Sequence, residues 1–201
     1  VVNAFDNVFN VECPLVGEFN VYNLLDSIST CFSLGINERV IIKALKKVKA
    51  PLGRFSVMNI TPNITAIIDF AHTPDGMENV LKTIKGVYFE KLVCVFGCGG
   101  NRDTGKRSIM GNIAEKYSNF IVLTSDNPRF EDPAKILDDI ERGMKKTNHV
   151  KIVDRREAIK YALGLVADGG VVAILGKGGE LYQDINGVKT PYNDFEEIEK
   201  I

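Results

Sequence analysis

From residue 65 onward, short runs rich in β-branched residues alternate with amphipathic segments. The strand-like runs cover 65–70, 91–97, 119–125, 150–154 and 171–176, and the segments with helical periodicity cover 77–84, 107–117, 133–144 and 156–166. Strands that alternate with helices in this way form βαβ units, in which each helix connects two parallel strands. The pattern therefore predicts an α/β fold with a doubly wound, mostly parallel sheet that is covered on both faces.

The two ends of the chain depart from this pattern. Residues 182–192 read YQDINGVKTPY, in which Asn-Gly is a turn signal, so we expect a C-terminal hairpin followed by a helix from Asn193. In the first 50 residues, a strand at 8–13 precedes two helical patterns at 21–35 and 38–49. Because Pro51-Leu52-Gly53 interrupts the chain, we expect two domains, 1–50 and 51–201. The chain begins with Val1, and we expect it to be a fragment whose first 50 residues are the tail of another domain.

Charge and cysteine content narrow the function classes. The 25 Lys and Arg residues balance 26 Asp and Glu residues, which argues against a general polyanion binder and predicts no nucleic-acid partner. No run approaches the roughly 18 apolar residues of a membrane span, so we predict a cytoplasmic protein without membrane contact. The four cysteines and two histidines lack the spacing of a zinc site, which predicts reduced structural thiols and no metal site.

Four unusual stretches begin where a predicted strand ends. They cover 71–74, 97–103, 125–129 and 176–180. Ligands of open parallel sheets bind beyond the carboxyl ends of the strands, where loops and helix N-termini present free N–H groups. If the strands are parallel, all four stretches lie on one rim, and that rim is the candidate binding site.

The charges on these stretches favour a zwitterionic ligand. Arg102, Lys106, Arg107 and Arg129 offer cations that suit a carboxylate or a phosphate, and Glu180 offers the opposite sign. An amino acid would match both. The alternative is that Arg102–Asp103 and Arg129–Glu131 are ordinary surface pairs, which contribute little energy.

A second alternative is nucleotide binding by the glycine-rich stretch. Residues 100–106 fit G-x-x-x-x-G-K after a strand, but Arg107 stands where a phosphate-binding loop needs Ser or Thr. The stretch also lacks the third glycine of a dinucleotide fingerprint. The loop at 125–129 fits the amino-acid interpretation better, because Pro128 stiffens the Asp-Asn-Pro-Arg turn and Asp126 and Arg129 therefore project from a restricted backbone.

Six motifs in order resemble the Mur ligases of peptidoglycan synthesis: GEFNVYN at 17–23, PLGR at 51–54, DFAHTP at 69–74, VFGCGGNRDTGKR at 95–107, TSDNPR at 124–129 and GKGGE at 176–180. The resemblance spans 14–194. Within the family, the sequence most resembles the branch that adds the third amino acid. It implies that residues 1–50 end the central ATPase domain and that 51–201 form the C-terminal, Rossmann-like amino-acid-binding domain.

The resemblance also implies residue roles. Asn20 and Asn23 would approach ATP, although both also suit helix capping. Arg54, Asp69 and His72 would meet the nucleotide when the domains close, although Asp69 at a strand end and His72 before Thr-Pro equally suit the stabilisation of a turn. The positions implied for amino-acid binding are Arg102, Asp126, Asn127, Pro128, Arg129, Gly176 and Glu180.

An arginine in the Asp-Asn-Pro-Arg motif goes with meso-diaminopimelate in this family, and its replacement goes with lysine, which remains the alternative substrate. Asn101, Ser108 and Gly179 depart from the residues usual in the family. Gly179 stands where the family has histidine, directly before Glu180.

The implied reaction is ATP-driven amide formation. A carboxylate of the UDP-linked muropeptide precursor becomes an acyl phosphate, and the amine of meso-diaminopimelate attacks it. ATP and Mg²⁺ would be bound mainly upstream of this chain, which implies no catalytic residue here and no ligase activity for the 201 residues alone. A non-catalytic α/β domain that binds a small molecule is the competing reading.

Overall fold

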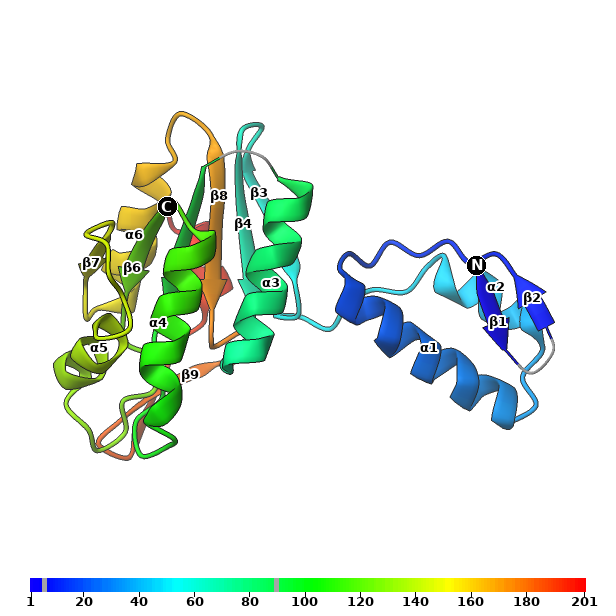
Figure 1. The fold of residues 1–201 in the computed structure, drawn as a ribbon, viewed down its shortest axis with the longest axis horizontal. Helices are drawn as coiled ribbons and strands as arrows, with labels where there is room; N and C mark the ends of the chain where they lie inside the picture. Colours follow the sequence, from blue (N-terminus) through cyan, green and yellow to red (C-terminus); the bar gives the residue numbers. More distant parts are fainter. Residues whose placement is uncertain (5–6, 89–90) are drawn as a thin grey trace. The chain divides into compact units, whose positions relative to one another are not determined.

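The computed structural model describes residues 1–4, 7–88 and 91–201, and these divide into two compact units, 1–51 and 52–201 (Figure 1).

The smaller unit consists of a short antiparallel strand pair and two helices, with bounds β1 Val2–Ala4, β2 Asn7–Phe9, α1 Glu18–Ser33 and α2 Glu38–Leu45. Its buried core contains Val2, Phe9, Ile28, Ile41 and Leu45. The strand predicted over 8–13 is shorter, because β1 offers only three residues as pairing partners. The helix predicted over 38–49 ends at Leu45, before the lysine-rich segment that leads to Pro51.

A six-stranded sheet forms the centre of the larger unit, in the order β3-β4-β8-β5-β6-β7. Only β3 is antiparallel to its neighbour, which confirms the predicted mostly parallel, doubly wound α/β fold. The strand bounds are β3 Ser56–Thr61, β4 Ile64–Asp69, β5 Leu92–Phe96, β6 Phe120–Leu123, β7 His149–Lys151 and β8 Gly170–Leu175.

Helices cover the sheet on both faces, with α3 and α4 side by side on one face and α6 on the other (Figure 1). Their starts follow from local sequence: Thr73, Asp132 and Asp154 accept hydrogen bonds from the first backbone N–H groups of α3, α5 and α6. The helix bounds are α3 Pro74–Val87, α4 Gly105–Tyr117, α5 Pro133–Glu141 and α6 Arg155–Leu165.

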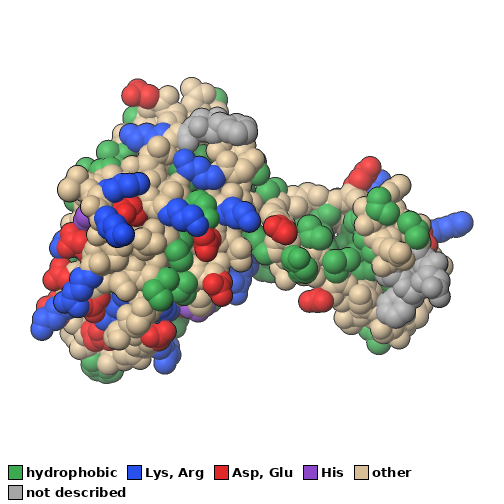
Figure 2. Space-filling model, viewed as in Figure 1, with side chains coloured by type: hydrophobic (Ala, Val, Ile, Leu, Met, Phe, Trp, Pro, Cys, Tyr) green, Lys and Arg blue, Asp and Glu red, His purple; other side chains and the backbone are tan. Residues whose placement is uncertain are grey.

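The chain ends as predicted, with a hairpin of β9 Tyr182–Ile185 and β10 Val188–Pro191 and a last helix, α7 Asp194–Glu199, capped by Asn193. Across the described residues, no helix is both long and apolar enough to cross a membrane. On the face shown in Figure 2, Lys and Arg side chains of the larger unit are interspersed with Asp and Glu.

Candidate functional site

The four loops that follow β4, β5, β6 and β8 lie together at the carboxyl edge of the sheet. Hydrogen bonds connect them: Lys106 Nζ donates to the His72 carbonyl over 2.6 Å, and the Gly100 N–H donates to the Asn127 carbonyl over 2.9 Å. Asn127 Nδ2 in turn donates to Glu180 Oε2 over 2.9 Å. The stretches that the sequence placed on one rim are therefore brought together by the fold.

A buried lysine organises the centre of this rim. Lys177 Nζ donates to Asn127 Oδ1 over 3.0 Å and to Glu180 Oε2 over 2.9 Å, and it lies 3.7 Å from Asp126 Oδ1. Its side chain is fully buried. Burial raises the pKa of Asp126 above its ordinary value, and the nearby ammonium of Lys177 opposes that shift. Sequence reasoning left Lys177 out of the site residues, although it lies between two of them.

Arg129 holds its side chain over the neighbouring loop. Its Nη1 donates to the carbonyl of Gly100 over 2.9 Å and lies 3.5 Å from the Asn127 carbonyl. Its backbone has φ +51°, a left-handed conformation that is uncommon for a residue with a side chain. Bonds from the Arg129 N–H to the Asp184 carbonyl and from the Asn186 N–H to the Arg129 carbonyl hold that conformation. Among the described residues, this guanidinium contacts the backbone carbonyls of Gly100 and Asn127, so its charge can face an added carboxylate.

Gly176 and Pro128 shape the backbone around these groups. Gly176 has φ +110°, and a Cβ there would lie 2.7 Å from Asp126 Oδ2. Only glycine combines that backbone with the close approach of the aspartate. Pro128 is buried in the turn that carries Arg129.

Arg102 and Arg107 differ from each other in their surroundings. Arg102 is exposed on the loop after β5. Arg107, expected to contribute to an anion-binding pocket, is instead buried and paired with Glu131 and Asp139 at 2.9 Å each. Its charge is thus already compensated, and Glu131 pairs with Arg107 rather than with Arg129, its partner in the surface-pair alternative.

The same loop is a poor phosphate cradle. The Asn101 N–H donates to Glu131 Oε1, and the Gly105 N–H donates to Asp103 Oδ1 over 2.8 Å. Two N–H groups that a phosphate-binding loop would turn toward a ligand are therefore occupied by carboxylates of the chain, which argues against the P-loop alternative.

Arg54, the first of the residues predicted to meet a nucleotide, lines a cavity of about 320 Å³ together with Phe70 and Glu180. The Arg54 guanidinium lies 4.7 Å from the centre of the Phe70 ring, and His72 Nδ1 lies 2.9 Å from the Phe70 carbonyl. Asp69 is buried and accepts hydrogen bonds from the N–H groups of Phe55 and Ala71 over 2.6 and 2.7 Å. Burial raises the pKa of Asp69, although these two bonds oppose the shift.

Asn20 and Asn23 lie on the first turns of α1 in the smaller unit. Asn20 Nδ2 donates to the Val16 carbonyl over 2.7 Å, and Asn23 Nδ2 donates to Asn20 Oδ1 over 3.2 Å. The N-cap position belongs to Gly17. The capping alternative for the two asparagines is therefore wrong, since neither side chain accepts from the free N–H groups of the helix.

All four cysteines are free thiols, as expected. Burial raises the pKa of Cys94 and of Cys98 to about 12, which keeps both protonated and unreactive at neutral pH. Within the described ranges, no group of three or more His, Cys, Asp and Glu side chains is placed to hold a metal ion.

Comparisons with known proteins cover most of the chain. Residues 53–178 match the family model described as Mur ligase, glutamate ligase domain. A UDP-N-acetylmuramoyl-L-alanyl-D-glutamate--2,6-diaminopimelate ligase of Aquifex aeolicus is 50% identical over 194 residues, which are 96% of this chain and 40% of that protein. The enzyme of the same name from Syntrophomonas wolfei is 45% identical over 94% of this chain and 39% of its own length.

Solved structures with a similar fold include a ligase of the same name as these relatives. A structure of a ligase with that name matches with a TM-score of 0.72 and 40% identity over 96% of this chain and 40% of its own. A folylpolyglutamate synthase of Mycobacterium tuberculosis matches with a TM-score of 0.70 at 22% identity over 83% of this chain and 39% of its own, a likeness of fold alone. This chain spans about 40% of the length of the first two relatives. Because the family model covers more than half of its residues, the chain belongs to the Mur ligase family.

Proposed function

We propose that this chain is the C-terminal part of an ATP-dependent ligase that adds meso-diaminopimelate to UDP-N-acetylmuramoyl-L-alanyl-D-glutamate in the cytoplasm. In this proposal, residues 1–50 end the central ATPase domain and 51–201 bind the incoming amino acid. The relatives that share 45–50% of its residues carry the name of that ligase. The observation that carries the substrate assignment is Arg129, whose guanidinium lies on the rim with backbone carbonyls as its partners.

The charges of the rim fit a diamino dicarboxylate. A carboxylate of meso-diaminopimelate would pair with Arg129, with exposed Arg102 available to a second carboxylate. Glu180 would receive an ammonium group through its other carboxylate oxygen, Oε1, because Oε2 already accepts from Lys177 and from Asn127, which position the carboxylate. Asp126, Pro128 and Gly176 hold the backbone that presents them.

The proposed nucleotide contacts are Arg54, Asp69 and His72 from the larger unit and Asn20 and Asn23 from the smaller one. Arg54 suits a phosphate because it is exposed at the edge of a cavity, and the Phe70 ring fixes its guanidinium. Buried Asp69 acts through the backbone, holding the N–H groups of Phe55 and Ala71. We assign Mg²⁺ to the upstream part of the enzyme.

In the proposed reaction, the γ-carboxylate of the D-glutamate residue becomes an acyl phosphate at the expense of ATP. The neutral amine of meso-diaminopimelate attacks its carbonyl carbon, the C–N bond forms, and phosphate leaves. This chain contributes orientation, because holding the amine near the acyl group can lower the barrier by about 7–11 kcal/mol in favourable cases. It also excludes water that would hydrolyse the activated acyl group.

The test uses the whole enzyme that contains this sequence, with amino-acid-dependent phosphate release as the readout. In Arg129→Ala, we expect kcat/KM for meso-diaminopimelate to fall about a hundredfold, while kcat/KM for lysine changes little. Arg142→Ala on the far loop after α5, where the side chain is 75% exposed, is the matched control and should leave both values unchanged.

Equal losses on both amino acids would contradict the assignment of Arg129 to the extra carboxylate. The absence of any amino-acid-dependent phosphate release would instead favour a non-catalytic binding module. We also expect the 201-residue chain alone to form no amide bond, and product from it would refute the division of labour proposed here.

A further inference from the structure

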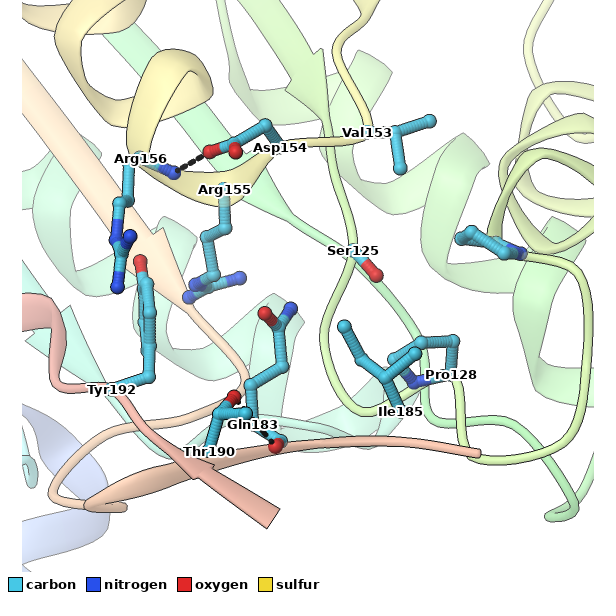
Figure 3. A pocket seen from close by; sticks show the side chains of 11 residues that line it. Ser125, Pro128, Val153, Asp154, Arg155, Arg156, Gln183, Ile185, Thr190 and Tyr192 are labelled. Atoms are coloured by element: carbon cyan, nitrogen blue, oxygen red, sulfur yellow. Dashed lines mark hydrogen bonds between the residues drawn. The ribbon is translucent and has the colours of Figure 1, made fainter. Parts of the chain in front are cut away.

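A second cavity lies beside the rim, on the α6 side of the loop after β6. Its volume is about 290 Å³, at the lower end of the range for small-molecule pockets. Its walls come from the loop after β6, the start of α6 and the C-terminal hairpin (Figure 3). Its lining includes Pro128, from the turn that carries Arg129, but not Arg102, Arg129 or Glu180, so the cavity lies beside the charged groups of the proposed substrate site.

Arg155 brings an unpaired donor to this cavity. Its side chain is fully buried, and its Nε and Nη2 donate to the two carboxylate oxygens of Asp194 over 2.8 Å each. Nη2 also donates to the Leu175 carbonyl over 3.1 Å. Nη1 has no hydrogen-bond partner among the described residues, and Arg155 is one of the residues that line the cavity (Figure 3). A buried N–H without an acceptor is costly, so this nitrogen calls for a ligand or an ordered water.

The rest of the lining supplies a second cation and polar groups. Arg156 lies next to Tyr192, with its guanidinium carbon 5.7 Å from the ring centre, and Figure 3 shows both arginines reaching from the start of α6 toward the hairpin. Ser125 and Gln183 line the cavity, and Gln183 Nε2 is held by the Asp126 carbonyl over 2.8 Å.

Carboxylates near the cavity are mostly committed. Asp154 Oδ1 accepts from the N–H groups of Arg156 and Glu157, and Asp194 is bound to Arg155. Glu197 lies 3.3 Å from the Arg156 Nε, but the Arg156 side chain is 57% exposed and can exchange that partner. The donors available to a ligand are therefore Arg155 Nη1, which has no partner among the described residues, and the Arg156 guanidinium once it exchanges Glu197.

We propose that this cavity binds a small oxyanion, a carboxylate or a phosphate group, through Arg155 Nη1 and the guanidinium of Arg156. Pro128, Val153 and Ile185 give the same cavity apolar walls that accommodate the body of such a ligand. The site is independent of the proposed ligase function. Its occupant would contact the loop that carries Asn127 and Arg129 through Ser125 and Pro128, on the cavity side.

The test uses the full 201-residue chain labelled with ¹⁵N, titrated with inorganic phosphate and separately with acetate at constant ionic strength. We expect one or both anions to shift the Arg155 Nε–H resonance and the side-chain amide of Gln183 with a saturable dependence on concentration. The two arms distinguish a phosphate site from a carboxylate site. In Arg156→Gln, the dissociation constant should rise about five- to tenfold.

Arg142→Gln is the matched control, because Arg142 also forms an exposed ion pair with a carboxylate, Asp139, outside this cavity. It should leave the dissociation constant unchanged. Neither anion shifting these resonances would overturn the proposal. So would a titration that weakens in Arg102→Gln and not in Arg156→Gln, since that result would assign the anion to the rim.

Discussion

Replacing Lys177 with methionine tests whether a buried ammonium holds the rim together. Methionine keeps most of the volume and removes the charge, so Asp126 and Glu180 lose the cation that lies 3.7 and 2.9 Å from them. Removing one partner of a buried ion pair costs about 3–5 kcal/mol, because the remaining charge stays uncompensated. For a domain of this size, that loss lowers the Tm by about 6–20 °C.

Guanidinium chloride unfolding of the full chain would measure the loss. The matched control is Lys160→Met, because Lys160 is exposed on α6 and its replacement should change the free energy of unfolding by less than about 0.5 kcal/mol. The decrease in free energy of unfolding caused by Lys177→Met should be smaller at pH 5 than at pH 8. Asp126 has a raised pKa because of its burial, and without Lys177 that pKa rises further, so protonation at acidic pH removes the uncompensated charge.

A double variant separates the charge effect from packing. Lys177→Met with Glu180→Gln removes the cation and one of its carboxylates together, so it should recover part of the stability lost by Lys177→Met alone. A Lys177→Met variant that unfolds at the same denaturant concentration as the wild type would show that the buried ammonium does not stabilise the rim. A double variant no more stable than Lys177→Met would show that the uncompensated Glu180 charge is not the cause of the loss.

Two further predictions concern the rim. Asp69→Asn should lower the free energy of unfolding by about 1–3 kcal/mol, because the amide can accept only one of the two backbone hydrogen bonds that the carboxylate accepts. Burial raises the pKa of Asp69, so the difference in free energy of unfolding between the wild type and this variant should shrink as pH rises from 4 through that pKa. Urea unfolding across pH 4–7 measures this difference, and a difference that grows with pH would contradict the prediction. Gly100→Ala should destabilise the chain by about 1–3 kcal/mol, since its Cβ would lie 1.9 Å from the Pro128 carbonyl oxygen. Gly164→Ala near the end of α6, whose Cβ meets nothing within 4 Å, should instead stabilise by about 0.5–1 kcal/mol, and equal thermal shifts for the two would contradict this account.

The sheet could be predicted because its central strands are buried along their whole length. In β5 and β8 every residue is buried, which leaves continuous apolar runs in the sequence. The edge strand β3 escaped prediction, because its residues alternate between half-buried and exposed and include Ser56, Asn59 and Thr61. Polar residues on an edge strand resemble a loop when only composition is considered.

The candidate site could be located from the sequence where a motif or a strand end marked it. The sequence was less informative where the burial of a side chain depends on distant segments. A lysine in the sequence indicates solvent exposure, yet Lys177 is buried because Asn127, about fifty positions earlier, folds against it. Arg107 was misassigned for the same reason, since Glu131 and Asp139 reach it from the next loop and helix. The buried pair of Arg155 and Asp194 gave no sequence signal at all.

The loop from 125 to 129 is held from two directions before any ligand arrives. Asn127 Oδ1 accepts from Lys177 Nζ and from the Asp184 N–H over 2.9 Å, so one amide joins the loop after β8 to the hairpin. The Arg129 N–H donates to the Asp184 carbonyl, which fixes the left-handed turn that aims its side chain at Gly100. A guanidinium held in this way loses little conformational freedom when it binds a carboxylate, which raises affinity without adding contacts. If Arg129 binds the extra carboxylate as proposed, discrimination between two amino acids that differ by that group would depend on this bracing as well as on the charge of Arg129.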